Sequence, residues 1–87
     1  MELPADEMAP VINRIKRARG QLDGIVRMLE EGRSCEEIVT QLAAVSKALD
    51  RAGFAVIASG LRQCVKGDPD SGELDVKRME KLFMSLA

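Results

Sequence analysis

The sequence contains no histidine among its 87 residues. Histidine is the side chain that most readily acts as a general base near neutral pH, and it is the commonest metal ligand in proteins. Its absence argues against hydrolytic catalysis and against a metal site of mixed histidine and cysteine ligands. Because no activated nucleophile and no substrate pocket can be recognised either, we expect that the chain is not an enzyme.

Aromatic residues are also scarce, since the chain has two phenylalanines and neither tryptophan nor tyrosine. Leu, Ile, Val, Met and Ala must therefore form the core, a composition that suits packed helices. The N-terminus does not resemble a signal peptide, and no apolar run reaches the roughly 18 residues of a membrane span. These features predict a cytoplasmic protein without membrane association.

Cysteine occurs only at Cys35 and Cys64. Two distant cysteines do not resemble the disulfide framework of a secreted domain. Because cytoplasmic thiols are normally reduced, one interpretation is a reactive or metal-binding pair. The other is two inert core residues, since free cysteine is often buried. The spacing alone does not decide between them.

The charges nearly balance, with 13 basic and 14 acidic side chains and a formal net charge of −1. Binding to nucleic acid must therefore come from a local basic patch. The length predicts a single domain over residues 1–87. A domain of this size usually needs disulfides, a metal or oligomerisation to be robust.

Hydrophobic spacing predicts an all-α protein with helices at about residues 9–31, 35–66 and 74–87. Pro10 is tolerated in a first helical turn. Residues 67–72 are rich in Gly, Asp, Pro and Ser, which predicts a loop between the second and third helices.

Local signals support these helix ends. Gly32 is typical of the residue after a helix, and Ser34 with Glu37 has the spacing of a capping box. Steps of three and four residues predict an apolar seam along the first helix, formed by Ile15, Ala18, Leu22, Ile25 and Leu29.

The predicted second helix is apolar around much of its circumference, so we expect it to self-associate. Cys35 and Cys64 lie 29 residues apart on it, close to eight whole turns, which places them on one face about 43 Å apart. A disulfide needs Cα atoms within roughly 7 Å, so the two thiols of one intact helix cannot meet. In an antiparallel dimer centred near Leu49 and Asp50, Cys35 of one copy would lie beside Cys64 of the other, giving two identical dithiol sites.

Cys35 is expected at the first position of this helix, where the helix dipole favours a thiolate. Glu36 and Glu37 oppose that effect and Arg33 supports it. We therefore expect a moderately reactive thiol, with Cys64 as its resolving partner.

Basic side chains are densest near the middle of the first helix, at Arg14, Lys16, Arg17 and Arg19. Lys47 and Arg51 lie one turn apart on the second helix. Arg51 is about 160° around the helix from Cys35, so it points away from the thiol. These residues form either a solvated helix face or a DNA-binding face. In the second case, helix faces rather than a helix-turn-helix motif would contact phosphates and grooves.

Three stretches of the chain carry a family resemblance. NRIKRARGQLDGI at residues 13–25 continues into VRMLEE at 26–31. Cys35 is followed by QLAAV at 41–45 and ALDRA at 48–52, and LRQCV occupies 61–65. In this order and spacing they resemble the copper-sensitive-operon repressor family over most of the chain.

The resemblance implies three-helix protomers with a long central helix, paired into antiparallel, four-helix-bundle-like dimers and assembled as a dimer of dimers. It implies a homotetrameric repressor that binds operator DNA until an inducer acts between the start of the second helix and the end of the partner's. Arg14 and Arg51 match family positions implicated in DNA binding, and Arg17 and Lys47 are expected beside them.

The nature of the inducer depends on the ligand set. The copper members hold Cu(I) with two cysteines and a histidine, but here Gly60 stands where the histidine is expected, while Cys35 and Cys64 match the cysteines. A pair of cysteines without the histidine looks like the persulfide-sensing branch, in which bridges of one or more sulfur atoms join thiols of different protomers. We therefore expect a persulfide or polysulfide as the partner of the thiols, without a resident cofactor or metal.

Three alternatives stay open. Cu(I) held by the Cys35 and Cys64 thiolates alone is one, because soft thiolates bind this ion well. A thiol sulfur-carrier protein is a second, and a structural helical oligomer with inert thiols is a third.

Overall fold

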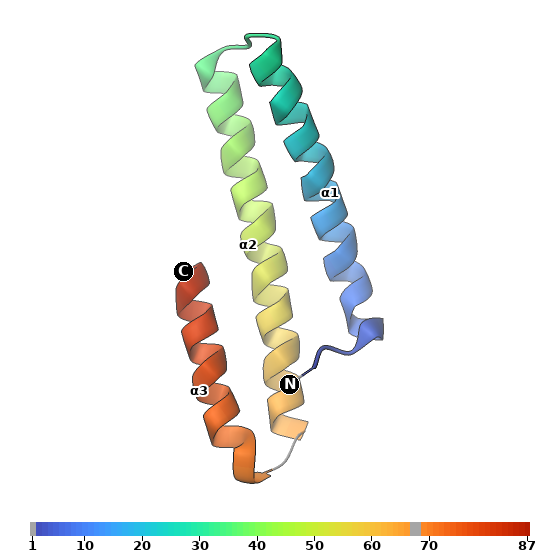
Figure 1. Cartoon of the computed structure of the whole chain (residues 1–87), viewed down its shortest axis with the longest axis vertical. Helices are drawn as coiled ribbons and strands as arrows, with labels where there is room; N and C mark the ends of the chain where they lie inside the picture. The colour runs from blue at the N-terminus through green and yellow to red at the C-terminus, as the bar shows by residue number, and fades with distance from the viewer. Residues whose placement is uncertain (1, 67–68) are drawn as a thin grey trace.

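The computed structural model describes residues 2–66 and 69–87, and the side chains of residues 2–63 and 76–87. Within these residues the chain forms α1 (Ala5–Glu30), α2 (Cys35–Lys66) and α3 (Pro69–Leu86), and no strand. Helix α2 lies between α1 and α3, and both neighbours run antiparallel to it (Figure 1). The all-α fold with a long central helix is therefore confirmed.

Helix α1 begins about four residues earlier than predicted. Pro4 precedes its first turn, and Pro10 lies inside the helix rather than in its first turn. A proline there removes the hydrogen bond to the Asp6 carbonyl, four residues earlier, and its ring crowds that carbonyl. Asp6 and Glu7 place negative charge in the first turn, where the helix dipole favours it, and so support the earlier start.

The C-terminus of α1 closes with a Schellman motif. The Gly32 amide donates to the Leu29 carbonyl at 3.2 Å, and the Arg33 amide donates to the Met28 carbonyl at 3.0 Å. Gly32 has a φ of 70°, a left-handed conformation that glycine adopts without steric cost. The sequence signal for this helix end is therefore confirmed, and the motif turns the chain into α2.

Helix α2 begins with the predicted cap. The Glu37 amide donates to the Ser34 hydroxyl at 3.2 Å, so Ser34 is the N-cap residue. The reciprocal half of the capping box is replaced by an ion pair, because the Glu37 carboxylate accepts a hydrogen bond from Arg33 Nε at 3.0 Å. The helix then continues without a break for 32 residues, or roughly 48 Å.

Helix α3 begins five residues before its predicted start, so the expectation of a loop is wrong at residues 69–72. Pro69 is the first helical residue, where a proline loses no intrahelical hydrogen bond and its fixed φ favours a helix. The composition of residues 67–72 placed this proline in a loop, although at the first position of a helix it favours helix formation. Residues 67–68 of the predicted loop lie outside the described part of the chain.

The three helices form a single layer that extends over 56 × 25 × 13 Å, about one helix thick. Such a layer buries little, and of the predicted seam in α1 only Ala18 and Ile25 are buried. Ile15, Leu22 and Leu29 stay 43–59% exposed, because α2 covers one side of α1 only. The buried apolar side chains among the described residues are Val11, Ala18, Ile25, Val45, Ala52, Ile57 and Met79.

Glycines allow α3 to approach the second half of α2. A Cβ atom added at Gly53 would lie 2.6 Å from Leu86 Cδ1, and one added at Gly60 would lie 2.8 Å from Met79 Cε. The Phe54 and Phe83 rings pack between the same two helices with centroids 5.3 Å apart. Both glycines thus permit close packing within an unbroken helix. No helix in the described part of the chain is long and apolar enough to cross a membrane.

Candidate functional site

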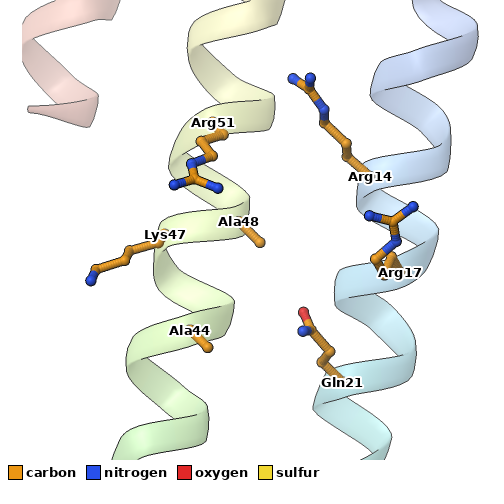
Figure 2. A pocket seen from close by; sticks show the side chains of 7 residues that line it. All are labelled: Arg14, Arg17, Gln21, Ala44, Lys47, Ala48 and Arg51. Carbon is orange, nitrogen blue, oxygen red and sulfur yellow. The ribbon is translucent and has the colours of Figure 1, made fainter.

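A basic groove lies between α1 and α2. It has a volume of about 360 Å³ and is lined by Arg14, Arg17, Gln21, Ala44, Lys47, Ala48 and Arg51 (Figure 2). All four basic residues singled out from the sequence line it, although Lys47 lies 30 residues after Arg17. On α1 the lining residues recur every three or four positions, and on α2 they occupy positions 44, 47, 48 and 51, so each helix presents one face to the groove. We call this site the basic groove.

Small side chains form part of the wall of the basic groove. The methyl groups of Ala44 and Ala48 project from α2 toward α1, where Arg17 and Gln21 lie opposite (Figure 2). Alanines leave open the space that long side chains at these positions would fill. The sequence analysis did not identify these alanines or Gln21 as groove residues, because their role depends on how the two helices pack.

The groove concentrates positive charge in a chain whose net charge is −1. Arg14, Arg17, Lys47 and Arg51 are all exposed. Arg33 pairs with Glu31 and Glu37, and Arg62 pairs with Glu7, whereas no groove cation forms an ion pair with another described residue. Four cations without an internal counterion are therefore available to an external anion.

Gln21 contributes an unpaired acceptor to the same groove. Its Oε1 atom is buried and has no hydrogen-bond partner among the described residues. A buried carbonyl oxygen without a donor is costly, so such atoms are usually satisfied once a partner or water is present. The guanidinium groups that line the groove are donors of the kind that Gln21 lacks.

Cys35 is the first residue of α2 and is exposed. The neighbouring Arg33 pairs with Glu37 at 3.0 Å and with Glu31 at 3.6 Å. The hydrogen bond and the charge of Glu37 raise the pKa of the Arg33 guanidinium, and Glu31 adds to the effect. Two carboxylates therefore offset the positive charge expected to support a Cys35 thiolate.

Cys64 lies in the last turns of α2, and its side chain is outside the described part of the structure. Because α2 is continuous, the Cα atoms of Cys35 and Cys64 are separated by roughly 43 Å. One chain therefore does not bring its two cysteines together. The groove and the cysteines also occupy different parts of α2, since Lys47 and Arg51 lie near its middle.

A polar cluster joins the start of α1 to the turn of α2 before Cys64. Ser59 is only 1% exposed, and its hydroxyl donates a hydrogen bond to Glu7 Oε2 at 2.6 Å. Arg62 Nη2 lies 3.4 Å from the same carboxylate oxygen. Sequence spacing gave no indication of this contact, because Glu7 and Ser59 are separated by 52 residues.

The resemblance implies a metal ion, and the donor atoms present in the chain decide which ion would fit. The described residues contain no cluster of three or more His, Cys, Asp or Glu side chains that could hold a metal ion. At Gly60, where the copper members have histidine, the space of a side chain is occupied by Met79. The Met79 Cε and Sδ atoms lie 2.8 and 3.3 Å from the ideal Cβ position. The Cys35 thiol and the Met79 thioether are sulfur donors, which suit a soft ion such as Cu(I).

Known proteins are similar to this chain in sequence and in fold. Residues 7–85 match the family model described as metal-sensitive transcriptional repressor. The chain is 43% identical over 63 residues to the copper-sensing transcriptional repressor CsoR of Mycobacterium tuberculosis, a match that covers 72% of this chain and 52% of that protein. It is 44% identical over 59 residues to the uncharacterized protein YrkD of Bacillus subtilis, covering 68% and 92% of the two chains.

The chain thus spans about half the length of the copper-sensing relatives that it matches. The structure of the nickel-responsive transcriptional regulator InrS aligns with a TM-score of 0.78 over 100% of this chain and 98% of that one. At 22% identity this likeness shows the shared fold. Since the family model covers nearly the whole chain, the protein belongs to the family of metal-sensitive transcriptional repressors.

Proposed function

We propose that this protein is a DNA-binding repressor that holds operator DNA with the basic groove and releases it when its cysteines react. The observation that carries the proposal is the gathering of Arg14, Arg17, Lys47 and Arg51 around one groove without internal counterions. Guanidinium and ammonium groups on two adjacent helices can pair with anionic phosphates, which supply most of the affinity of proteins for DNA.

The proposed active form is a homo-oligomer. The layer leaves large apolar side chains exposed on α1 and α2, and surfaces of this kind in soluble proteins mark interfaces. Two copies of α2 packed antiparallel would cover the apolar side chains Val39, Leu42 and Leu49 and bring Cys35 beside the second copy's Cys64. Assembly of two such dimers into a tetramer follows the family resemblance.

The proposed signal is a persulfide or polysulfide, acting in the cytoplasm where thiols are reduced. The Cys35 thiolate attacks the outer sulfur of the donor, the donor thiolate leaves, and a Cys35 persulfide forms. The Cys64 thiolate of the second copy attacks that persulfide and expels hydrosulfide, leaving a disulfide. Where Cys35 carries two added sulfur atoms, the same attack leaves a trisulfide. The exposure of Cys35 supports its role as the attacking thiol.

The bridge would lower the DNA affinity by favouring one arrangement of the helices. An inducer shifts an equilibrium only by its differential affinity for the two states, so the bridged state must bind DNA more weakly. Helix α2 carries Cys35, Lys47 and Arg51 and can link the thiols to the groove. The contact between Glu7 and Ser59 connects α1 to the Cys64 end of the same helix.

Copper sensing is the second candidate. It is favoured by the copper-sensing relatives and by the sulfur-rich donor set. If the protein senses copper, Cys35 of one protomer and Cys64 of the other would hold Cu(I) between them, since thiolates select this ion.

The first experiment tests the basic groove. We expect Arg14→Ala and Arg51→Ala each to weaken binding to DNA from upstream of the gene by about tenfold or more, and to reduce the salt dependence by about one phosphate contact each. Lys81→Ala is the control, because Lys81 is an exposed cation on α3 outside the groove. Fluorescence anisotropy across a salt series measures both quantities, and equal losses in all three variants would contradict the groove.

The second experiment tests the thiols. Polysulfide treatment of the wild type should produce covalent dimers joined by a disulfide or by a trisulfide with one added sulfur atom, observed by non-reducing mass spectrometry, and should release DNA. Cys35→Ala should bind DNA normally and ignore the polysulfide. An unmodified monomer mass after treatment would refute persulfide sensing and leave the DNA-binding proposal standing.

A further inference from the structure

We propose that the thioether of Met79 is the third donor of a Cu(I) site, completed by the thiolates of Cys64 and of Cys35 from a second copy. The assignment rests on the antiparallel pairing put forward above. It goes beyond that function, because it identifies a donor on α3 that replaces the missing histidine. The sequence could not show this donor, since Met79 follows Gly60 by 19 residues.

The geometry at Gly60 carries the assignment. Among the described residues, and outside the helix's own backbone and the chain neighbours of Gly60, the heavy atoms within 4 Å of the ideal Cβ position at residue 60 are Met79 Cε and Sδ. The sulfur lies 3.3 Å from that position, in the space that a side chain at residue 60 would enter. Residues 60 and 64 are one helical turn apart on the same face of α2. The thioether is thus placed one turn from the backbone of Cys64.

The surroundings of Met79 suit a soft ion. Its side chain is 4% exposed and packs with Ile57, Phe54 and Val76. It also borders an apolar concavity of about 340 Å³ between α2 and α3, which leaves a path from solvent. Methionine has three rotatable bonds and a polarizable sulfur, so it can turn toward the thiols without moving the backbone.

Replacing the imidazole by the Met79 thioether leaves the charge of the ligand set unchanged. Cys and Met sulfur ligands select Cu(I), and a thioether is neutral, as is the imidazole that it would replace. Two thiolates with one neutral donor therefore give the same net charge in either ligand set. The apolar wall around Met79 limits water at the site, which controls its dielectric and access.

The test compares Met79→Leu with Met84→Leu in the full chain under anaerobic, reducing conditions. Leucine keeps the volume and removes the sulfur. Met84 is the matched control, since it lies on the same helix beside the same concavity but is 70% exposed. In a competition titration with a Cu(I) chelator, Met79→Leu should lower the Cu(I) affinity at least tenfold, because loss of an outer partner alone costs 10–100-fold. Met84→Leu should match the wild type.

X-ray absorption of the copper-loaded wild type supplies a readout that does not depend on a variant. Three sulfur donors are expected for the wild type and for Met84→Leu, and two for Met79→Leu. Two donors in the wild type, or an unchanged affinity in Met79→Leu, would overturn the assignment. A greater loss of Cu(I) affinity in Met28→Leu than in Met79→Leu would also overturn it. Met28 would then be the donor, since it lines a concavity with Glu36 at the Cys35 end of α2.

The same variants separate this inference from the proposed function. Met79→Leu should still form the polysulfide bridge and release DNA, since that reaction uses the two thiols. If Cys35→Ala leaves the Cu(I) affinity unchanged, the shared thiol site fails. If Cys35→Ala lowers it and Met79→Leu does not, the thiol site stands and only the third donor fails.

Discussion

At the scale of single residues, polar atoms connect parts of the chain that are far apart in sequence. Ser59 is buried on α2, and its hydroxyl finds the Glu7 carboxylate on α1 rather than a backbone carbonyl of its own helix. Ser85 shows the other behaviour, since its hydroxyl donates to the Leu82 carbonyl within α3. The first bond joins two helices and the second is local, so the two serines should contribute differently to stability.

Ser59→Ala should lower the free energy of unfolding by about 1–2 kcal/mol. The change removes a hydrogen bond to a charged group, and the partial exposure of Glu7 keeps the loss at the lower end of the usual range. Urea denaturation followed by circular dichroism, at one fixed protein concentration, measures it. Ser85→Ala is the control, with an expected change within about 0.5 kcal/mol. Equal effects of the two substitutions would show that the contact with Glu7 is not stabilising.

At the scale of the helices, the ends depend on local residues, because a proline can favour the start of a helix and a glycine can end one. Pro69 is at the first position of α3 and favours that helix, while Gly32 ends α1 with a φ of 70°. Gly20, in contrast, is in the interior of α1, where nothing lies within 4 Å of an added Cβ atom. Gly32 also has open space around it, so the two glycines differ only in backbone conformation.

Alanine at these two glycines should therefore have opposite effects. Gly32→Ala should destabilise the protein by about 1–2 kcal/mol, because a left-handed conformation places Cβ too close to the next carbonyl oxygen. Gly20→Ala should stabilise it by up to about 1 kcal/mol, the helix preference of alanine over glycine. Thermal unfolding of both variants tests the pair. Stabilisation by Gly32→Ala would mean that residue 32 does not keep its positive φ in solution.

At the scale of the whole molecule, the flat layer of helices leaves the protomer with too little core. Its 13 Å thickness corresponds to one helix, so each of α1 and α2 keeps an apolar face that no other part of the described chain covers. A second copy on α2 would cover that face and also supply the distant thiol. Pairing would thus stabilise the fold and assemble the proposed sensing site.

Leu49→Glu should convert the proposed dimer into a monomer. Leu49 is 41% exposed and lies near the centre of the expected two-fold axis, so each glutamate would face its own copy. Analytical ultracentrifugation measures the dissociation constant of the dimer. We expect this constant to rise at least about a hundredfold, since burying two like charges costs several kcal/mol. Lys81→Glu, on α3 away from this face, should leave the dimer intact. A dimer unaffected by Leu49→Glu would exclude the antiparallel α2 interface.

Periodicity and local signals alone determined that the protein is all-helical, where α1 ends and where α2 begins. These features depend on contacts within one or two helical turns, which the order of residues encodes directly. The family resemblance, in contrast, selected Arg14, Arg17, Lys47 and Arg51 among the basic residues. The starts of α1 and α3 were missed because Pro10 and Pro69 were interpreted from residue type, whereas their effect depends on their position in the helix.

Only the tertiary structure decided which side chains from different helices meet. It placed Gln21, Ala44 and Ala48 beside the basic residues, and Met79 beside Gly60. It also showed that much of the predicted seam of α1 faces outward. The relative rotation and separation of two helices result from the packing of many side chains together. No single spacing in the sequence specifies them, and contacts between helices therefore had to be observed.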